Sequence, residues 1–311
     1  MNQTCLYKNQ VSFSSMGDLN RATELFRKQP NDPEALEKLN AYRHFRLNCL
    51  RTSLQFIQQA EPPKRVLISA RLKRIRSIRR KLIRGQRGSI NEMDDIIGFR
   101  VICESLTEAL ELGSRIKDIC EARIKNYLEH HHSKDIGYRA LHGIIKFDQP
   151  FGVTTVKVRF EVQIRTWYQH LWACWCESHG EHAKEGFIDN LENKKIRELK
   201  QSLVGISQLI ADWEQAYSLH TQLKLPEYVG PFNIALAWYN NRNNFGFDPF
   251  GLDIDGAVNE LYRLESFSDT EPLLLVGIGQ SDQIKNILAK THPKFMVRGF
   301  LDPQHWIPKP I

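Results

Sequence analysis

Two acidic residues stand where strands could present them to a metal ion or to an attacking hydroxyl group. Asp95 follows Asp94 and directly precedes the apolar run 96–103. This order predicts a carboxylate at the mouth of a strand, where oxygen ligands could hold a divalent cation. Glu161 lies within a predicted strand and could contact the same cation or take a proton from an attacking hydroxyl. An aspartate before a strand is more often only a turn or cap residue, and that alternative stays open.

The segment 153–166 alternates strictly between apolar and polar residues. Its apolar members are Val156, Val158, Phe160, Val162 and Ile164, and its polar members are Lys157, Arg159, Glu161, Gln163 and Arg165. A period of two predicts a strand with one core face and one polar face. A face washed by solvent explains such a pattern as well as a functional face that places Glu161 among phosphate-binding cations.

A cluster of basic residues lies between Arg71 and Arg84, with eight lysines and arginines and no acidic residue. We predict a basic helix here. Apolar residues that could face a core recur at helical spacing: Leu72, Ile75, Ile78 and Leu82. A polar stripe recurs on another face: Lys73, Ser77, Lys81 and Arg84. Such a stripe suits a polyphosphate, whereas a solvated basic face or an RNA contact would use the same residues.

The composition indicates a soluble globular protein with a polyanionic partner. The 311 residues include 43 Lys and Arg against 36 Asp and Glu, which gives a net charge of +7. No run approaches the ~20 apolar residues of a membrane span, and the polar N-terminus lacks the apolar part of a signal peptide. The six cysteines are scattered rather than arranged as a secreted disulfide framework. We therefore expect a cytoplasmic protein with no membrane partner.

The elements that must position these residues follow from the hydrophobic pattern. The first ~60 residues are predicted to be helical, with Asp32 as a cap and Pro33 at the first helical position. Pro62 and Pro63 end that segment. Between 65 and 185 we predict the basic helix, a strand at 96–103, a helix near 106–129, and strands near 143–148 and 153–166. Mixed elements of this kind favour an α+β unit.

A long helix is predicted over 196–217, because its apolar residues alternate spacings of three and four. This seam could pack within the chain or join two copies in a homo-oligomer. Beyond Pro226 the pattern predicts a strand at 232–239, an Asn-rich turn, a helix at 256–264, a strand at 273–276 and a helix at 281–290. We therefore expect three units, namely a helical segment 1–64, a central domain 65–190, and a long helix with a small βα extension over 191–311.

Five ordered blocks within about 65–185 closely resemble the RelA/SpoT (p)ppGpp synthetase domain. They are Arg71-Leu-Lys73 with Ser77 and Lys81-Leu, Asp95-Ile-Ile-Gly-Phe-Arg100, Lys134-Asp-Ile-Gly-Tyr138-Arg139-Ala-Leu-His142, Glu161-Val-Gln163-Ile-Arg165-Thr, and Trp172-Ala. The resemblance implies an α+β fold of the nucleotidyltransferase-like kind, with a mixed β-sheet flanked by helices.

The resemblance also implies a role for each matched residue. ATP would be bound by Arg71, Lys73, Ser77, Lys81 and Arg100, with Arg100 completing a sandwich around the adenine. Asp95 and Glu161 would hold Mg²⁺, and Glu161 would also activate the 3′-hydroxyl of the acceptor. The acceptor itself would be bound by Lys134, Tyr138, Arg139, His142, Gln163 and Arg165, of which Tyr138 stacks on the base.

The implied reaction is transfer of pyrophosphate from ATP to the 3′-hydroxyl of GDP or GTP. The segment 133–140 departs from the Pro-Lys-Pro-Asn-Gly-Tyr-Arg-Ser of the family, because it reads Ser-Lys-Asp-Ile-Gly-Tyr-Arg-Ala. Two alternatives therefore stay open. One is a toxin-type relative that pyrophosphorylates adenine nucleotides or the 3′ end of tRNA, and the other is an inactive regulator that binds a nucleotide or RNA.

Overall fold

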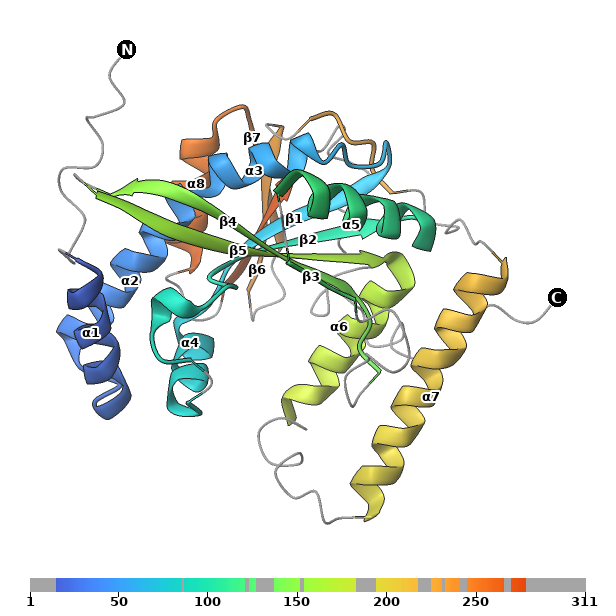
Figure 1. Cartoon of the computed structure of the whole chain (residues 1–311), viewed down its shortest axis with the longest axis horizontal. Helices are drawn as coiled ribbons and strands as arrows, with labels where there is room; N and C mark the ends of the chain where they lie inside the picture. The colour runs from blue at the N-terminus through green and yellow to red at the C-terminus, as the bar shows by residue number, and fades with distance from the viewer. Residues whose placement is uncertain are drawn as a thin grey trace.

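The fold is built on one eight-stranded mixed sheet with helices on both faces (Figure 1). The computed structural model describes residues 15–85, 87–120, 123–126, 137–151, 154–182, 194–217, 225–230, 233–240, 245–265 and 270–277. Within these residues no helix combines the length and the apolar character that crossing a membrane requires. The α+β fold class expected from the sequence is confirmed.

Three helices precede the sheet: α1 (Met16–Lys28), α2 (Pro33–Asn48) and α3 (Leu50–Gln59). The side chain of Asp32 accepts a hydrogen bond from the backbone N–H of Ala35 at 2.8 Å, and Pro33 begins α2. Asp32 therefore satisfies one of the unpaired amides at the helix start, as the sequence predicts. The helix α3 ends before Pro62, because proline cannot supply the N–H that a further turn would need.

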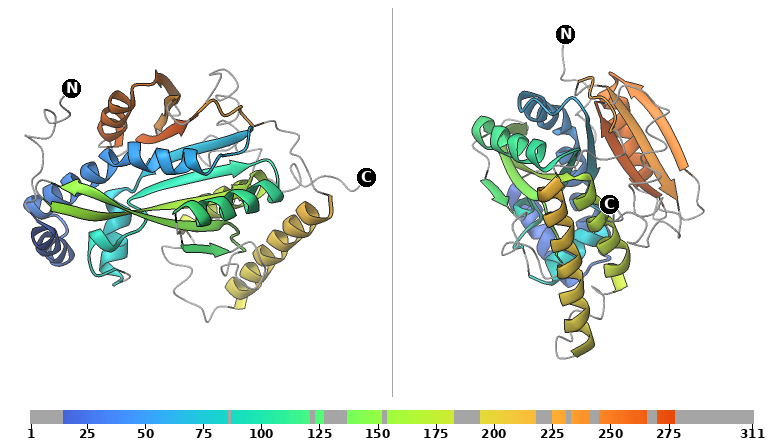
Figure 2. Two further views of the ribbon diagram at one scale, coloured as in Figure 1. Left: turned by 45° about the horizontal axis from the view of Figure 1, so that its top comes forward. Right: turned by 90° about the vertical axis from the view of Figure 1, so that its right-hand side faces the viewer.

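The strands follow the order β3-β4-β5-β2-β1-β8-β6-β7 across the sheet. Their bounds are β1 (Val66–Leu72), β2 (Ile97–Cys103), β3 (Arg123–Asn126), β4 (Leu141–Phe151), β5 (Thr154–Thr166), β6 (Ile234–Asn240), β7 (Phe245–Gly251) and β8 (Thr270–Val276). Only β2 and β5 pair in parallel among these strands, and the other neighbours are antiparallel. The C-terminal strands β6, β7 and β8 thus continue the sheet beyond β1 (Figure 2).

The two faces of β5 have opposite characters. Val158, Phe160 and Val162 of β5 are buried in the main core, which also receives α3, α5 (Leu106–Cys120) and α8 (Ile254–Glu265). The alternate side chains of β5, including Glu161 and Gln163, lie on the other face, where α4 (Ile75–Ile83) and α6 (Trp167–His182) are found (Figure 1). The alternation in the sequence therefore marks a core face and a polar face, as predicted.

The prediction of one basic helix from Arg71 onward is wrong. Arg71 belongs to β1, Lys73 lies in the link, and α4 begins only at Ile75. The backbone N–H of Lys73 donates to the carbonyl of Ile96 at 2.8 Å, which continues the pairing with β2. Hydrogen bonding on both edges of β1, to β2 and to β8, outweighs the helical spacing that Leu72 shares with Ile75, Ile78 and Leu82. The predicted polar stripe is therefore divided between a strand, a link and a helix.

Other boundaries also differ from the predicted ones. The helix predicted over 106–129 ends at Cys120, and β3 follows because 123–126 pair with β4. The strand β7 was missed next to the Asn-rich turn, and its pairing with β6 fixes it. The helix predicted at 281–290 lies outside the described residues. The long helix is confirmed as α7 (Lys194–Tyr217).

The apolar seam of α7 packs within the chain. Ile210 and Trp172 of α6 form a small buried cluster, against which Leu203 and Ile206 are packed. Trp172 is only 1% exposed. The structure therefore supports the intramolecular interpretation of this seam, and a homo-oligomer stays a prediction.

Candidate active site

A pocket lies on the polar face of the sheet, where β5, β2, β1 and β8 run side by side. Its lining residues are Ser69, Arg71, Asp95, Gly98, Phe99, Arg100, Glu161, Gln163 and Leu273. Strand register arranges two rows across this face. Arg71 pairs with Gly98 and Gly98 with Glu161 in one row, and Ser69, Arg100 and Gln163 form the next.

Gly98 leaves the floor of the pocket open between a cation and a carboxylate. A Cβ atom built at Gly98 would meet only the Nε of Arg71, at 4.0 Å. A larger side chain would project into the space between Arg71 and Glu161. A glycine in a strand often marks the close approach of a ligand, and here it does so at the centre of the pocket.

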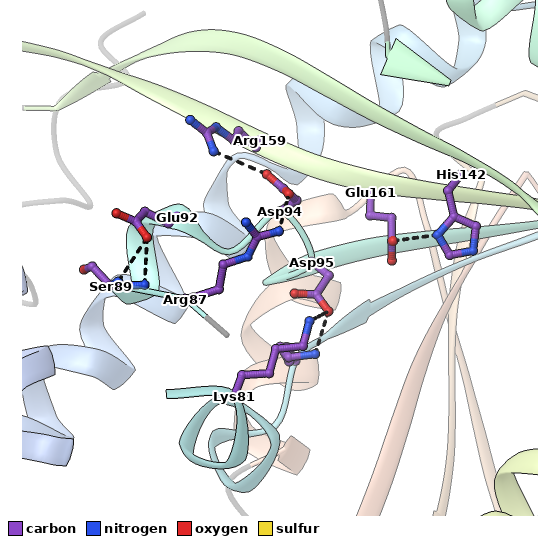
Figure 3. Close-up of polar contacts among 11 residues, drawn as sticks. Lys81, Arg87, Ser89, Glu92, Asp94, Asp95, His142, Arg159 and Glu161 are labelled. Carbon is purple, nitrogen blue, oxygen red and sulfur yellow. Dashed lines mark hydrogen bonds and ion pairs between the residues drawn. The ribbon is translucent and has the colours of Figure 1, made fainter. Parts of the chain in front are cut away.

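Asp95 binds two lysines at the entrance of β2. Its Oδ2 accepts hydrogen bonds from the Nζ of Lys73 at 2.7 Å and of Lys81 at 2.8 Å (Figure 3). Burial by itself raises the pKa of the Asp95 carboxyl, but the two ammonium groups outweigh it and hold the pKa far below its usual range. Burial lowers the pKa of Lys73, an effect that Asp95 opposes. Asp95 is therefore ionised at neutral pH, with a cation on either side.

Its neighbour Asp94 has a different environment. The carboxylate of Asp94 contacts the Nη2 of Arg87 at 3.0 Å and the Nη1 of Arg159 at 3.4 Å (Figure 3). These contacts tie the loop before β2 to β5. The acidic pair seen in the sequence thus divides into one pocket residue, Asp95, and one residue that anchors a loop.

Glu161 is the second carboxylate of the pocket. Its Oε1 lies 2.9 Å from the Nδ1 of His142, and its Oε2 accepts from the Nε2 of Gln163 at 2.8 Å. Burial raises the pKa of the Glu161 carboxyl, but the hydrogen bond and charge of His142 and the hydrogen bond of Gln163 together lower it to about 2. The nearby charge of Asp95 acts in the opposite direction. Both carboxylates of the pocket are therefore ionised at neutral pH.

A closed ring of hydrogen bonds surrounds Glu161. The Nε2 of His142 lies 2.7 Å from the hydroxyl of Tyr138, and that hydroxyl accepts a hydrogen bond from Arg165. The same Nη2 of Arg165 donates to the Oε1 of Gln163 at 2.6 Å. The Nε2 of Gln163 donates to Glu161, which closes the ring. The guanidinium carbon of Arg165 also lies 4.7 Å from the centre of the Tyr138 ring. Four predicted acceptor-binding residues thus orient one another and Glu161.

The structure directs Arg139 away from this ring. Arg139 is 3% exposed and donates to the Oγ of Ser207 at 3.0 Å and to the Oε1 of Gln208 at 2.6 Å, both on α7. Ser207 in turn donates to the carbonyl of Gly137. The helix α7 therefore binds the residues on both sides of Tyr138. The phosphate role of Arg139 stays a prediction, and its side chain is packed against α7.

The remaining predicted residues occupy different positions. Arg71 and Arg100 line the pocket with Asp95 and Glu161. Ser77 is half-buried on α4, the helix that also carries Lys81. Lys134 lies outside the described residues. The site therefore collects most of the predicted donor and acceptor residues around the two carboxylates.

Some residues of the site were not predicted. Ser69 lines the pocket from β1, and its alternation with Arg71 in the run Val-Leu-Ile-Ser-Ala-Arg-Leu could have indicated a strand with a polar face. Leu273 of β8 also lines the pocket, more than 100 residues further along the chain than any other lining residue. Ser207 of α7 is also remote in the sequence. No local pattern marks either of these two residues, because only the tertiary fold brings them to the site.

The donor atoms of the pocket fit a hard divalent cation. Mg²⁺ prefers oxygen ligands and is commonly held by one or two carboxylates together with substrate phosphates. Asp95 and Glu161 supply two such ionised carboxylates. Within the part of the chain that the structure describes, no group of three or more His, Cys, Asp or Glu could hold a metal ion. The two carboxylates would therefore need oxygens from a substrate to complete the coordination.

Comparison with known proteins identifies one region of the chain. Residues 70–185 match the family model described as a region found in RelA / SpoT proteins. No curated protein matches the chain.

Three solved structures are similar to parts of the chain. Small alarmone synthetase 2 from Bacillus subtilis is 25% identical, with 59% of this chain and 97% of that chain covered and a TM-score of 0.43. Small alarmone synthetase 1 from Bacillus subtilis, bound to its product pppGpp, is 19% identical, with 58% and 94% covered and a TM-score of 0.45. A GTP pyrophosphokinase family protein from Streptococcus pneumoniae is 20% identical, with 54% and 85% covered and a TM-score of 0.42.

Proposed function

We propose that this chain, whose residues 70–185 form a RelA/SpoT-type region, is a nucleotide pyrophosphokinase that transfers pyrophosphate from ATP to the 3′-hydroxyl of GDP or GTP. The observation that carries the proposal is the placement of Asp95 and Glu161. Both are ionised carboxylates, they line one pocket, and lysines and arginines surround them. A pocket of this charge distribution suits a polyphosphate bound together with a divalent cation.

The donor, ATP, would be bound by four cationic side chains on β1, β2, α4 and the link between β1 and α4. Arg71 and Arg100 line the pocket, and Lys73 and Lys81 meet at Asp95. Lysine acts as a point charge on phosphate oxygens, whereas a guanidinium group can also stack on a base. These four cations would stabilise the triphosphate and the charge that passes to the leaving AMP.

The acceptor would approach from the side of Glu161. Tyr138 and His142 belong to the hydrogen-bonded ring that orients this carboxylate. In the proposed step the 3′-oxygen forms a bond to the β-phosphorus of ATP, the bond from that phosphorus to the α-phosphate oxygen breaks, and AMP leaves with the bonding electrons. Glu161 receives the proton of the hydroxyl. A carboxylate with a pKa of about 2 is a weak base, so its main contribution is to orient the hydroxyl in line.

Mg²⁺ fits the two carboxylates and, when bound, would neutralise charge on the transferred phosphates. Asp95 would hold it through the oxygen that the two lysines leave open, since both lysines bind Oδ2. Glu161 would add a second oxygen from β5.

Product analysis tests the proposal. The purified chain is supplied with Mg²⁺, ATP labelled in its β-phosphate, and one acceptor at a time: GDP, GTP, AMP, ATP or deacylated tRNA. We expect 3′-pyrophosphorylated guanosine nucleotides and AMP in equal amounts. Glu161→Gln should reduce the rate by at least roughly 10²-fold, because the hydroxyl is no longer held in line.

The other outcomes separate the alternatives. Label on the 3′ end of tRNA or on AMP, but not on GDP or GTP, would favour the toxin-type activity. Arg79 is an exposed residue of α4 that could contact a nucleic-acid backbone, and Arg79→Glu should weaken transfer only if tRNA is the acceptor. Binding of ATP without any transfer to any acceptor would favour an inactive regulator.

A further inference from the structure

The pocket has a wall that comes from outside the RelA/SpoT-type region. Leu273 lies on β8 and lines the pocket together with Ser69, Arg71 and Arg100. The family match ends at residue 185, so this strand belongs to the C-terminal part of the chain. The strand reaches the pocket because β8 pairs with β1 in the shared sheet (Figure 2).

Strand register places Leu273 beside Arg71. The antiparallel pairs Ser69 with Leu275 and Ala70 with Leu274 are formed between β1 and β8. Continuing this register by one residue puts Leu273 opposite Arg71, and the alternation of a strand puts both side chains on the pocket face. Leu273 is half-buried. On one side it packs against a buried apolar cluster that includes Leu275 of the same strand and Leu67 of β1. Its other side contributes to the pocket.

The pocket is therefore charged at one end and partly apolar at the other. The row across the sheet runs from Glu161 over Gly98 to Arg71 and then to Leu273. Three strand spacings of ~4.8 Å separate the two ends by roughly 14 Å. Asp95 and its two lysines lie beside this row, where β2 begins and β1 ends, and phosphates belong next to these lysines. A planar, largely apolar group belongs at the other end, where guanidinium groups can stack on it and a leucine can cover its edge.

We propose that Leu273 forms part of the binding site for the nucleobase of the donor nucleotide, so that the C-terminal β8 completes the donor site of the RelA/SpoT-type region. This inference rests on the proposed function for the identity of the donor. It assigns to the C-terminal strands a direct contact with substrate, in addition to their place in the sheet.

Binding measurements on the full chain test this role without requiring catalysis. Affinities for ATP and for inorganic tripolyphosphate, each with Mg²⁺ and without acceptor, are measured by calorimetry for the parent chain and for Leu273→Ala. Losing roughly 40 Å² of apolar contact with a base corresponds to about a 5-fold weaker affinity at ~25 cal/mol per Å². We therefore expect ATP to bind about 5-fold more weakly to Leu273→Ala, and tripolyphosphate to bind equally well to both. Leu273→Met should retain most of the affinity for ATP.

Two controls separate a lost contact from a damaged fold. Leu252→Ala changes a leucine of the C-terminal part that is 79% exposed, and it should alter neither affinity. Leu275→Ala removes a buried side chain of the same strand that is not among the pocket residues. It should lower the unfolding temperature but keep the ratio of the ATP and tripolyphosphate affinities.

The outcomes also distinguish this inference from the proposed function. Unchanged ATP affinity in a folded Leu273→Ala chain, or equal losses for ATP and tripolyphosphate, would overturn the role of Leu273 and leave pyrophosphate transfer standing. If Leu273→Ala selectively weakens ATP binding while the parent chain transfers pyrophosphate to no acceptor, the role of Leu273 is supported and the proposed activity is refuted.

Discussion

Replacing Glu161 by glutamine should destabilise the protein by an amount that depends on pH. The carboxyl of Glu161 is 17% exposed, and its hydrogen bonds to His142 and Gln163 favour the ionised form. Its pKa is about 2, against an ordinary value of 4.5. A difference of that size corresponds to on the order of 3 kcal/mol between the two protonation states. Glu161→Gln resembles the protonated state, so it should lose about that much free energy of unfolding at pH 7.

The sign of the pH dependence follows from the lowered pKa. A carboxyl whose pKa is lower in the folded chain than in the unfolded chain stabilises the fold above its unfolded pKa. This stabilisation is lost as the pH falls through the folded pKa. For Glu161 the window runs from about 4.5 down to about 2. The difference between the parent and Glu161→Gln should therefore be largest above pH 5 and approach zero near pH 2.

Urea unfolding at a series of pH values from 2 to 7 measures this difference directly. In a separate thermal scan near neutral pH, the unfolding temperature of the variant should be lower than that of the parent by roughly 5–10 °C, with the fold retained. Glu111→Gln is a matched control, because that glutamate is 61% exposed and its contact with Arg115 is 3.9 Å long. In a His142→Gln background the difference between the two chains should shrink, because the hydrogen bond and charge of His142 contribute most to the lowered pKa of Glu161. A destabilisation that is the same at pH 3 and pH 7 would refute the assigned pairing of Glu161.

Three further perturbations test the other parts of the site. Asp95→Asn should reduce transfer by at least about 10²-fold, since it removes a charged oxygen ligand. Without Mg²⁺ it should bind ATP more tightly, because Lys73 and Lys81 lose their common carboxylate, and calorimetry in EDTA would show this. Tyr138→Ala should raise the KM for the acceptor by about tenfold and leave the KM for ATP unchanged, since a stacked base contributes ~1–3 kcal/mol. Steady-state kinetics with each substrate varied in turn measure both KM values, and an unchanged KM for the acceptor would contradict the stacking role of Tyr138. Gly137→Ala should lower the unfolding temperature, because Gly137 has a φ of +71° and a Cβ there would lie 2.5 Å from the Cβ of Ser207. Thermal unfolding at pH 7 measures the shift, and a chain as stable as the parent would contradict the close packing of α7 on this turn.

The sequence alone determined the polar and apolar faces of β5 and the acidic entrance to β2. Both are local patterns, since a period of two and an aspartate before an apolar run need no distant partner to be recognised. The start of α2 at Asp32 and Pro33 is equally local. The resemblance to the family then predicted which residues of these elements belong to one site, and the match of residues 70–185 supports the resemblance itself.

Tertiary structure decided the features that depend on partners far away in the chain. The segment 66–72 forms a strand because β2 and β8 hydrogen-bond to its two edges, although Leu72 also continues the helical spacing of Ile75, Ile78 and Leu82. Glu161 has its lowered pKa largely because His142 reaches it from the neighbouring strand β4. Arg139 is held by α7, and Leu273 reaches the pocket from β8. These positions result from sheet order and packing between segments far apart in sequence, which short-range patterns of residues do not encode.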